Sequence, residues 1–343
     1  MTSTYLYLLT IVLAAGVTAL CLPLFRCTLG HFFWDVPDGN LKHHTQAVPL
    51  VGGIAILAGL ATSLVFIRLT TNFPTGTLHS LRGILYGAGI IFLLGLIDDL
   101  RKPKGLSVPL KLTFQSLAIF CLMYYGVHIT LWDMPALYYP LTFLWVLGIT
   151  NAFNLLDISD GLCVSQALVC ALGLWLIALP SERIYVNFCA CALIGVCIGF
   201  WPYNHSRLRK TFLGDSGSTL LGFILAALAM GTDYSEHSNW GFLAPLLILA
   251  IPIFDTAFVS FIRLSQLKNP LRGSNDHAAL RLKAVGFSSR QVLLTFFIIA
   301  LCFNLMAYAV TQWEADDALL IYTFAIVLAI VVTVYLARIR MPK

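Results

Sequence analysis

Two amides and two carboxylates lie close together between two long apolar segments. Asn151, Asn154, Asp157 and Asp160 follow one another at steps of three residues, so any helical portion places them along one side. Apolar helices do not need this density of polar oxygens, whereas Asn and Asp oxygens are ligand types that magnesium prefers. Residues 151–162 therefore predict a site for a cation or a polar substrate at a membrane surface.

Further acids stand where apolar segments end or begin. Asp98 and Asp99 are adjacent at the end of one segment, where they repel each other near the negative end of the helix dipole. A polar helix stop is the plain alternative, but a nearby cation would relieve the cost. Asp215 lies in a Gly-Asp-Ser-Gly-Ser run, residues 214–218, just before another apolar segment. It either caps that helix or borders a phosphate site made by free backbone N–H groups.

Basic and amide side chains accompany these acids. Lys111 and Gln115 are four residues apart, on one helical face, although a Lys near the end of a span usually reaches back to the interface. Three cationic or titratable side chains in one late polar loop would suit a diphosphate: Arg272, His277 and Arg281.

Composition sets the class of protein. The chain has 343 residues, 59% hydrophobic and 11% charged, whereas a soluble domain carries about 25% charged residues. A span needs about 20 mostly apolar residues. We therefore expect an all-α polytopic membrane protein with about 11 transmembrane helices, over 4–25, 49–69, 83–97, 110–125, 137–153, 162–180, 184–201, 216–231, 241–262, 291–312 and 318–337.

The basic residues predict the orientation. All of the 21 Lys and Arg residues except Arg68, Arg82 and Arg183 fall on one side of this topology, which places the C-terminus in the cytoplasm and the N-terminus outside. A basic face with short carboxylates suits an anionic substrate brought in with a divalent metal. We expect one membrane domain, residues 1–343, with its active site on cytoplasmic loops 26–48, 98–111, 151–162, 202–218 and 255–290.

These motifs carry a resemblance to a known family. The sequence resembles the polyprenyl-phosphate N-acetylhexosamine-1-phosphate transferases (glycosyltransferase family 4) over roughly residues 35–290. The shared motifs, in order, are Asp-x-Pro, Lys-x-His and Pro-x-x-Gly-Gly within 35–53, Gly-Leu-Ile-Asp-Asp at 95–99, Lys-x-x-x-Gln at 111–115, Asn-Ala-x-Asn-x-x-Asp-x-x-Asp-Gly at 151–161, Phe-x-Gly-Asp-x-Gly-Ser at 212–218 and Pro-x-x-Asp at 252–255. Residues 212–218 and 49–53 look closer to the undecaprenyl-phosphate GlcNAc-1-phosphate transferase branch than to the phospho-N-acetylmuramoyl-pentapeptide transferase branch.

The resemblance implies a reaction and its setting. The enzyme would transfer N-acetylhexosamine-1-phosphate from a UDP-sugar to undecaprenyl phosphate or another polyprenyl phosphate. This releases UMP and forms the first lipid-linked intermediate of a cell-envelope polysaccharide, such as lipopolysaccharide O-antigen or cell wall. The cofactor would be Mg²⁺, with Mn²⁺ as an alternative. The setting would be the bacterial inner (plasma) membrane, with membrane lipids but no nucleic acid as partners, and a homodimer is left open.

The resemblance also implies roles for residues. Phe212 would stack on uracil. Asp98 is either the general base or the group that orients Lys111 or the metal, since a lipid phosphate is already ionised at neutral pH. The catalytic set is Asp98, Asp99, Lys111, Asp160 and His277, and the metal set is Asn154, Asp215 and Asp99. The substrate-binding set is Lys42, His44, Asn151, Asn154, Asp157, Asp160, Phe212, Arg272, His277 and Arg281.

Three departures from the family pattern point to a different sugar. Leu41 stands where the family usually has Arg, and Ile158 stands where it often has Gly. After His277, residues 278–280 are Ala-Ala-Leu where the family often has further histidines. We therefore expect a subfamily acting on another N-acetylhexosamine or a derivative.

Two rival hypotheses come from other classes. A transporter or lipid flippase would place its carboxylates near the bilayer midplane in repeated halves, whereas here they cluster at one face and the halves do not repeat. A scaffold that has lost catalysis would not need the retained polar residues, which are Asp98, Asp99, Asn154, Asp160 and Asp215.

Overall fold

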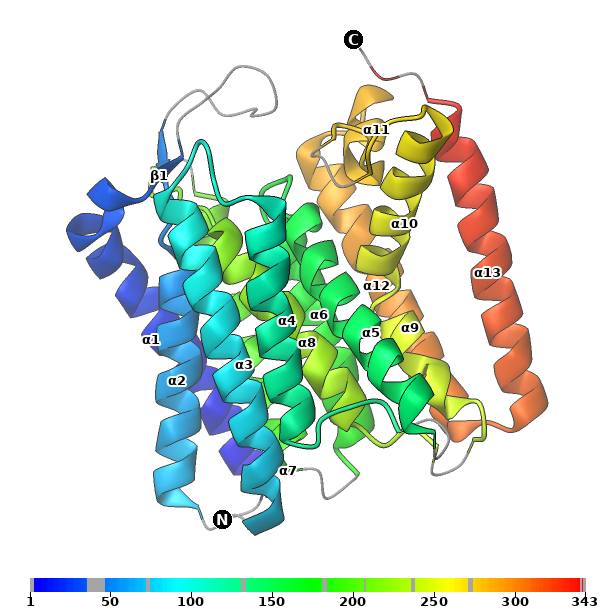
Figure 1. Cartoon of the computed structure of the whole chain (residues 1–343), viewed down its shortest axis with the longest axis horizontal. Helices are drawn as coiled ribbons and strands as arrows, with labels where there is room; N and C mark the ends of the chain where they lie inside the picture. The colour runs from blue at the N-terminus through cyan, green and yellow to red at the C-terminus, as the bar shows by residue number, and fades with distance from the viewer. Residues whose placement is uncertain are drawn as a thin grey trace.

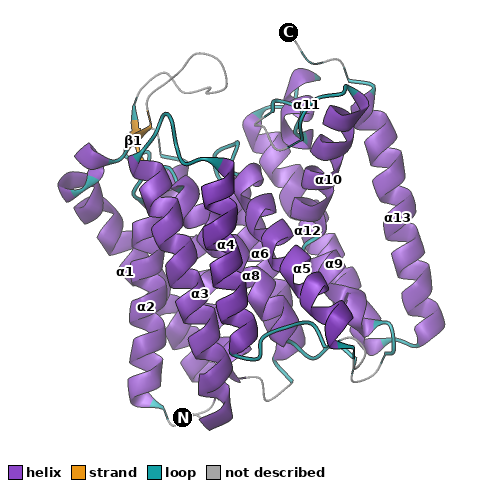
Figure 2. Ribbon diagram, viewed as in Figure 1, coloured by secondary structure: helices purple, strands orange, loops and turns teal. Residues whose placement is uncertain are grey.

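Long helices run side by side through most of the molecule (Figure 1). The computed structural model describes residues 3–35, 47–71, 75–130, 134–180, 184–206, 208–235, 238–270, 274–339 and 341. Strands β1 (Trp34–Asp35) and β2 (Val48–Pro49) form an antiparallel pair, and the rest of the regular structure is helical (Figure 2). The two chain ends lie at opposite ends of the helices, and β1, α11 and the C-terminus share one end (Figure 1). We call it the motif end.

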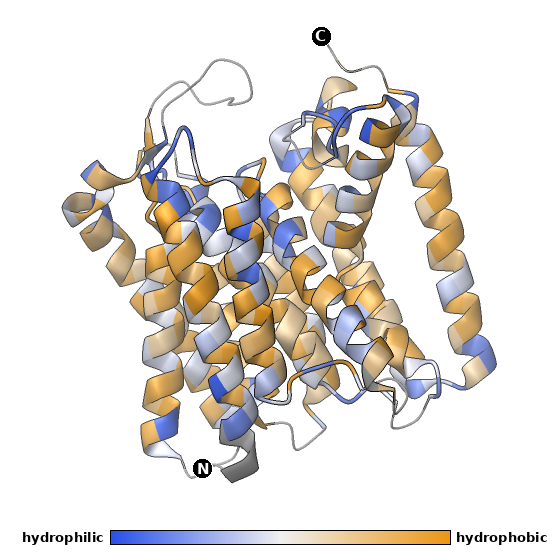
Figure 3. Cartoon of the chain, in the orientation of Figure 1, coloured by the Kyte–Doolittle hydropathy of each residue, from blue (hydrophilic) through white to orange (hydrophobic). Residues whose placement is uncertain are grey.

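The helices follow the apolar segments of the sequence. They are α1 (Ser3–Thr28), η1 (Gly30–Phe32), α2 (Gly52–Thr70), α3 (Thr75–Leu100), α4 (Val108–Tyr124), α5 (Pro135–Leu156), α6 (Leu162–Ala178), α7 (Ile184–Asn204), α8 (Gly214–Gly231), η2 (Gly241–Leu243), α9 (Ala244–Ile248), α10 (Ala250–Ser265), α11 (Ala278–Ala284), α12 (Ser289–Gln312) and α13 (Ala315–Ala337). Hydrophilic segments gather toward the ends of the helices, and their middle parts are mostly hydrophobic (Figure 3).

The fold is that of a polytopic helical membrane protein. Within the described ranges, eight helices are long and apolar enough to cross a bilayer, and η2–α9 with α10 form a further pair bent by 68°. The apolar helices α4 and α6 have 17 residues each, or about 26 Å at 1.5 Å per residue, a little short of the roughly 30 Å hydrocarbon core. The count of 11 spans depends on these shorter or bent elements and stays a prediction.

Two predicted segments end too early. The segment expected at 83–97 continues to Leu100, and the one expected at 137–153 continues to Leu156. The reason is that main-chain hydrogen bonds form whether a side chain is polar or apolar, so each helix continues beyond its apolar segment. Asp98, Asp99 and Asn154 therefore sit in final helical turns, which fixes their directions more firmly than loops would.

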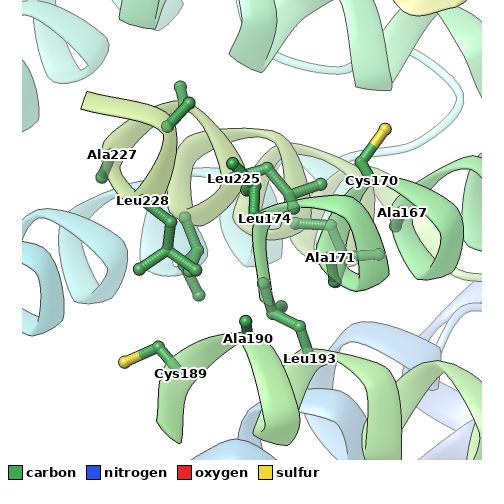
Figure 4. Close-up of a cluster of buried hydrophobic side chains, with 14 of the residues drawn as sticks. Ala167, Cys170, Ala171, Leu174, Cys189, Ala190, Leu193, Leu225, Ala227 and Leu228 are labelled. Carbon is green, nitrogen blue, oxygen red and sulfur yellow. The ribbon is translucent and has the colours of Figure 1, made fainter. Parts of the chain in front are cut away.

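The core forms around α6, α7 and α8. The spanning windows of α7 and α8 are each 83% buried, against 22% for α1 and 17% for α13. Many contacting side chains are small, such as Ala167, Ala171 and Ala190, with Leu174 and Leu193 filling the space between them (Figure 4). Because lipid is as apolar as these side chains, helices in a membrane associate chiefly through close packing. The site is thus built on rigid, central helices.

Glycines bring three segments together at the motif end. The Gly52 N–H donates to Phe212 O at 3.1 Å, and the Gly53 N–H donates to Leu213 O at 2.9 Å. A Cβ at Gly95 would lie 2.4 Å from the Ser216 Cα. Only glycine allows this approach. It seats α2 and α3 on the first turn of α8.

Candidate active site

Acids and lysines from separate segments converge at the motif end. Lys111 Nζ donates to Asp98 Oδ2 at 2.9 Å and to Asp215 Oδ2 at 3.1 Å. Lys102 Nζ lies 2.9 Å from Asp99 Oδ1 and 3.0 Å from Asp215 Oδ1. Residues of α3, α4 and α8 therefore form one cluster with the loop between α3 and α4, and we call it the carboxylate cluster. Its four predicted members lie together, as the motif order suggested.

Asp99 caps α8 from another helix. Asp99 is buried, with 2% of the residue exposed. Oδ1 accepts from the Asp215 N–H at 2.9 Å, and Oδ2 accepts from the Ser216 N–H at 3.0 Å and the Ser216 hydroxyl at 2.8 Å. A carboxylate at a helix N-terminus is favoured by the helix dipole. Asp215 is thus not the cap of α8, and the N–H groups of Asp215 and Ser216 are not free for phosphate.

Lys102 is the member that sequence reasoning missed. Burial alone lowers the pKa of Lys102, but the carboxylates of Asp215 and Asp99 outweigh burial and raise its pKa above the ordinary value. Its ammonium therefore stays charged at neutral pH. The available signal was its position three residues after Asp99, which is one helical turn.

The two amides of the 151–162 motif tie helices together. Asn151 and Gln115 exchange two amide hydrogen bonds of 3.2 Å each, which join α5 to α4. The Ser218 hydroxyl donates to Asn154 Oδ1 at 2.9 Å, which joins α8 to α5. Both Asn residues thus contact neighbouring motifs, and the Asn154 oxygen proposed for metal already accepts one hydrogen bond.

Asp157 has a carboxylate without a partner. It follows the last turn of α5, and no described residue donates a hydrogen bond to it or lies within ion-pair distance. Burial raises the pKa of Asp157 well above its ordinary value, and the charges of Asp215 and Asp99 raise it further while Lys102 lowers it. Together with Asp157, the carboxylate cluster brings four carboxyl groups near the two ammonium groups of Lys102 and Lys111. The carboxyl groups outnumber the ammonium groups by two, and a bound divalent cation would favour the ionised form of Asp157.

This unpaired carboxylate predicts a pH-dependent gain in stability on substitution. Because the folded-state pKa of Asp157 lies above its unfolded value of about 3.9, the folded state holds a proton that the unfolded state has lost, so rising pH lowers the free energy of unfolding. Asp157→Asn removes the ionisable group and with it this fall in the free energy of unfolding. In EDTA, the variant should unfold at a higher temperature than the parent chain, by a margin that widens with pH and then levels off.

The control for this measurement is Asp316→Asn, which changes an exposed acid in the first turn of α13. It should track the parent chain across the same range. A stability margin for Asp157→Asn that shrinks as pH rises would contradict the assignment of a raised pKa.

A second cluster adjoins the first. Lys210 Nζ lies 2.7 Å from Asp160 Oδ2 and 5.2 Å from the centre of the Phe212 ring. Lys283 Nζ, from α11, donates to the Ser159 hydroxyl at 2.8 Å. The charge of Asp160 acts on both Asp157 and Lys283, so the two clusters are neighbours. We call Ser159, Asp160, Lys210, Phe212 and Lys283 the lysine cluster.

Asn204 fixes the turn that carries this cluster. The Gly161 N–H donates to Asn204 Oδ1, and Asn204 Nδ2 donates to Thr211 O at 3.0 Å. One side chain at the end of α7 therefore holds the 151–162 and 211–218 segments in register. Gly161 has φ +76°, a left-handed conformation that glycine adopts without strain.

His277 and Arg281 lie elsewhere. His277 Nδ1 is 2.6 Å from Asp255 Oδ2, and Arg281 donates to Leu336 O at 3.0 Å and Ile339 O at 2.8 Å. They are 1% and 3% exposed. The structure thus uses them to join α10, α11 and the end of α13, not to form the carboxylate cluster.

Three predicted site residues fall outside the described ranges: Lys42, His44 and Arg272.

The fold defines a polytopic helical membrane protein with clustered acids and lysines at its motif end, and comparisons identify its family. Residues 81–233 match the model of glycosyl transferase family 4. The chain is 31% identical over 283 residues to a probable undecaprenyl-phosphate N-acetylglucosaminyl 1-phosphate transferase of Bacillus subtilis, covering 80% of this chain and 76% of the relative. It is 28% identical to a decaprenyl-phosphate N-acetylglucosaminephosphotransferase of Mycolicibacterium smegmatis, covering 84% and 78%.

A third relative is the phospho-N-acetylmuramoyl-pentapeptide-transferase of Heliobacterium modesticaldum, 34% identical and covering 57% of this chain and 64% of the relative. The chain therefore belongs to glycosyl transferase family 4, the polyprenyl-phosphate N-acetylhexosamine-1-phosphate transferases, and is an enzyme. The resemblance inferred from the motifs is confirmed.

Proposed function

We propose that this enzyme transfers an N-acetylhexosamine-1-phosphate from a UDP-sugar to undecaprenyl phosphate and releases UMP. A phosphate oxygen of the lipid attacks the phosphorus that carries the sugar, and the bond from that phosphorus to UMP breaks. Phosphoryl transfer chiefly needs positioning and charge neutralisation. The observation that supports the proposal is the pairing of two clusters: one in which the carboxyl groups, with Asp157, outnumber the two ammonium groups, and an adjoining one that holds two lysines.

Mg²⁺ fits this charge balance. In the described ranges, no three Asp, Glu, His or Cys side chains are grouped so that they alone could hold a metal ion. Mg²⁺ usually binds through one or two carboxylates plus substrate phosphates, so a protein cage is not needed. Asp215, whose side chain is 20% exposed, and unpaired Asp157 are the proposed ligands. Asp157 replaces Asp99, whose oxygens are occupied by the α8 cap.

The bound ion would supply charge neutralisation on the donor diphosphate. Lys111 is placed to hold a phosphate oxygen, and Asp98 orients it, because the Asp98 carboxylate also accepts from the Leu106 N–H at 2.6 Å. A separate base is not required, since the attacking phosphate is already ionised at neutral pH. Phe212 is placed to stack on uracil beside Lys210.

The membrane arrangement is proposed with the reaction. The bent pair and the two 17-residue helices would complete 11 spans, with the N-terminus outside and the motif end in the cytoplasm of a bacterial inner membrane. Nearly all Lys and Arg residues lie on that side in this topology. The lipid acceptor would then reach the carboxylate cluster from the inner leaflet.

The test gives purified, detergent-solubilised protein a panel of radiolabelled donors with undecaprenyl phosphate and Mg²⁺. The panel contains UDP-GlcNAc, other UDP-N-acetylhexosamines and UDP-N-acetylmuramoyl-pentapeptide. We expect lipid-linked label and an equal amount of UMP with one N-acetylhexosamine donor, and loss of turnover in EDTA that excess Mg²⁺ restores. No transfer with any donor would refute the function, and full turnover in EDTA would refute the metal.

A further inference from the structure

Lys283 is a half-buried cation that no described residue neutralises. Its ammonium donates to the neutral Ser159 hydroxyl at 2.8 Å. Among the described residues, no carboxylate lies within ion-pair distance of it. Asp160, the acid that acts on it, is already paired with Lys210 at 2.7 Å. The lysine cluster therefore holds two positive charges and one negative charge.

This arrangement is costly without an anion. Burial lowers the pKa of Lys283, and the nearby Lys210 lowers it further while Asp160 raises it. Two lysines that share one carboxylate repel each other, and removing a cation from water is unfavourable unless it is paired. An anion bound between Lys210 and Lys283 would relieve both costs.

The neighbouring groups indicate which anion. Lys210 lies over the Phe212 ring, and an aromatic ring can stack on a nucleobase. On the other side, the charges of Asp160 and Asp215 both raise the pKa of Asp157. The lysine cluster therefore adjoins the surplus acids of the carboxylate cluster. A nucleoside diphosphate carrying a divalent cation has this layout: an aromatic base, phosphate oxygens and a positive ion.

We propose that Lys283 binds a phosphate oxygen of the donor's diphosphate and so sets the affinity for the nucleotide-sugar. This assignment rests on the proposed function and deepens it. The Ser159 hydroxyl holds the ammonium in place until the donor arrives. The bound segment is the diphosphate and not the uridine, because a base and ribose offer no charge to an ammonium.

The test compares Lys283→Met, which keeps the length but removes the charge, with Lys283→Arg, which keeps the charge. Binding of UDP, UMP and uridine to the full-length solubilised protein is measured by equilibrium dialysis. Loss of one charge-assisted hydrogen bond predicts about 10- to 100-fold weaker UDP binding for Lys283→Met. Uridine binding should be unchanged, and Lys283→Arg should lie within about threefold of the parent chain. The Michaelis constant for the UDP-sugar should rise likewise, with that for undecaprenyl phosphate unchanged.

Two controls separate ligand binding from loop support. Lys268→Met removes an exposed lysine whose ammonium donates to Gln266, and it should change nothing. The second control is uridine, which lacks the diphosphate but reports on the rest of the site. If Lys283→Met weakens uridine binding as much as UDP binding, Lys283 only supports the loop and the proposal is overturned.

The remaining outcomes are equally decisive. Unchanged UDP binding in Lys283→Met, in a parent chain that transfers sugar-phosphate, overturns this inference and leaves the function standing. A rise confined to the Michaelis constant for the lipid phosphate would assign Lys283 to the acceptor, which also overturns it. If the parent chain binds no uridine nucleotide and transfers nothing, the proposed function itself fails and the inference falls with it.

Discussion

Replacing Asp215 with Asn is expected to lower turnover by at least about 10³-fold, or roughly 4 kcal/mol of transition-state stabilisation. Asp215 is the carboxylate that accepts from both lysines of the carboxylate cluster, at 3.0 and 3.1 Å. It is also the one with a partly exposed side chain that a substrate could reach. Asn keeps the shape but removes a charge, so a divalent cation is held weakly and the two ammonium groups lose their shared partner. The measurement is the initial rate of lipid-linked product at saturating donor, acceptor and Mg²⁺.

Two comparisons make this result interpretable. Asp316→Asn, at the exposed start of α13, should transfer at the parent rate. Raising Mg²⁺ should recover part of the lost rate in Asp215→Asn if weak ion binding is the cause. Turnover within about threefold of the parent chain would remove Asp215 from the reaction and leave Asp157 as the only proposed ligand for the ion.

The convergence of the acids could be predicted because membrane topology restricts where polar groups can lie. Asp98, Lys111 and Asp215 are far apart in the chain, but each stands at the end of an apolar segment on the basic face. Those ends meet at one surface, and the structure shows them within hydrogen-bond distance. Sequence reasoning can therefore assign such residues to a common face, although it cannot give their pairings.

The use of each carboxylate could not be predicted, because it depends on backbone approach. Asp98 and Asp99 are adjacent and chemically identical, yet one holds Lys111 and the other caps α8. That division follows from Gly95, which lets α3 approach Ser216 until the Asp99 carboxylate reaches the first N–H groups of α8. No residue spacing specifies such a contact between helices.

The late loop shows the opposite limit. Arg281 looked suited to a diphosphate because of its charge, but its partners are the main-chain carbonyls of Leu336 and Ile339. Carbonyl groups left free at a helix end are invisible in a motif, since every residue has one. Lys283, two residues further on, belongs to no motif. Only its hydrogen bond to Ser159 in the structure identifies it as a candidate site residue.

Replacing Asp99 with Ala is expected to cost about 3–5 kcal/mol of folding free energy, as the loss of one partner from a buried ion pair usually does. Lys102 would keep its charge without its nearest carboxylate, and the Asp215 and Ser216 N–H groups would lose their acceptor. At about 2 °C per kcal/mol, the unfolding temperature should fall by roughly 6–10 °C. Intrinsic fluorescence of the solubilised protein during heating would measure this fall.

Asp99→Asn separates charge from shape. Its amide oxygen can still accept from Ser216, but its NH₂ group would face the Asp215 N–H and the Lys102 ammonium, both of which are donors. We therefore expect an intermediate loss of stability, with Asp316→Ala unchanged. If Asp99→Ala unfolds within about 2 °C of the parent chain but loses all turnover, Asp99 acts on the substrate or its metal, and the cap is not its principal role. We expect stability and turnover to fall together. The Asp99 carboxylate holds α3 to α8, and it does so by binding the backbone N–H groups of Asp215 and Ser216, so its loss would also displace Asp215.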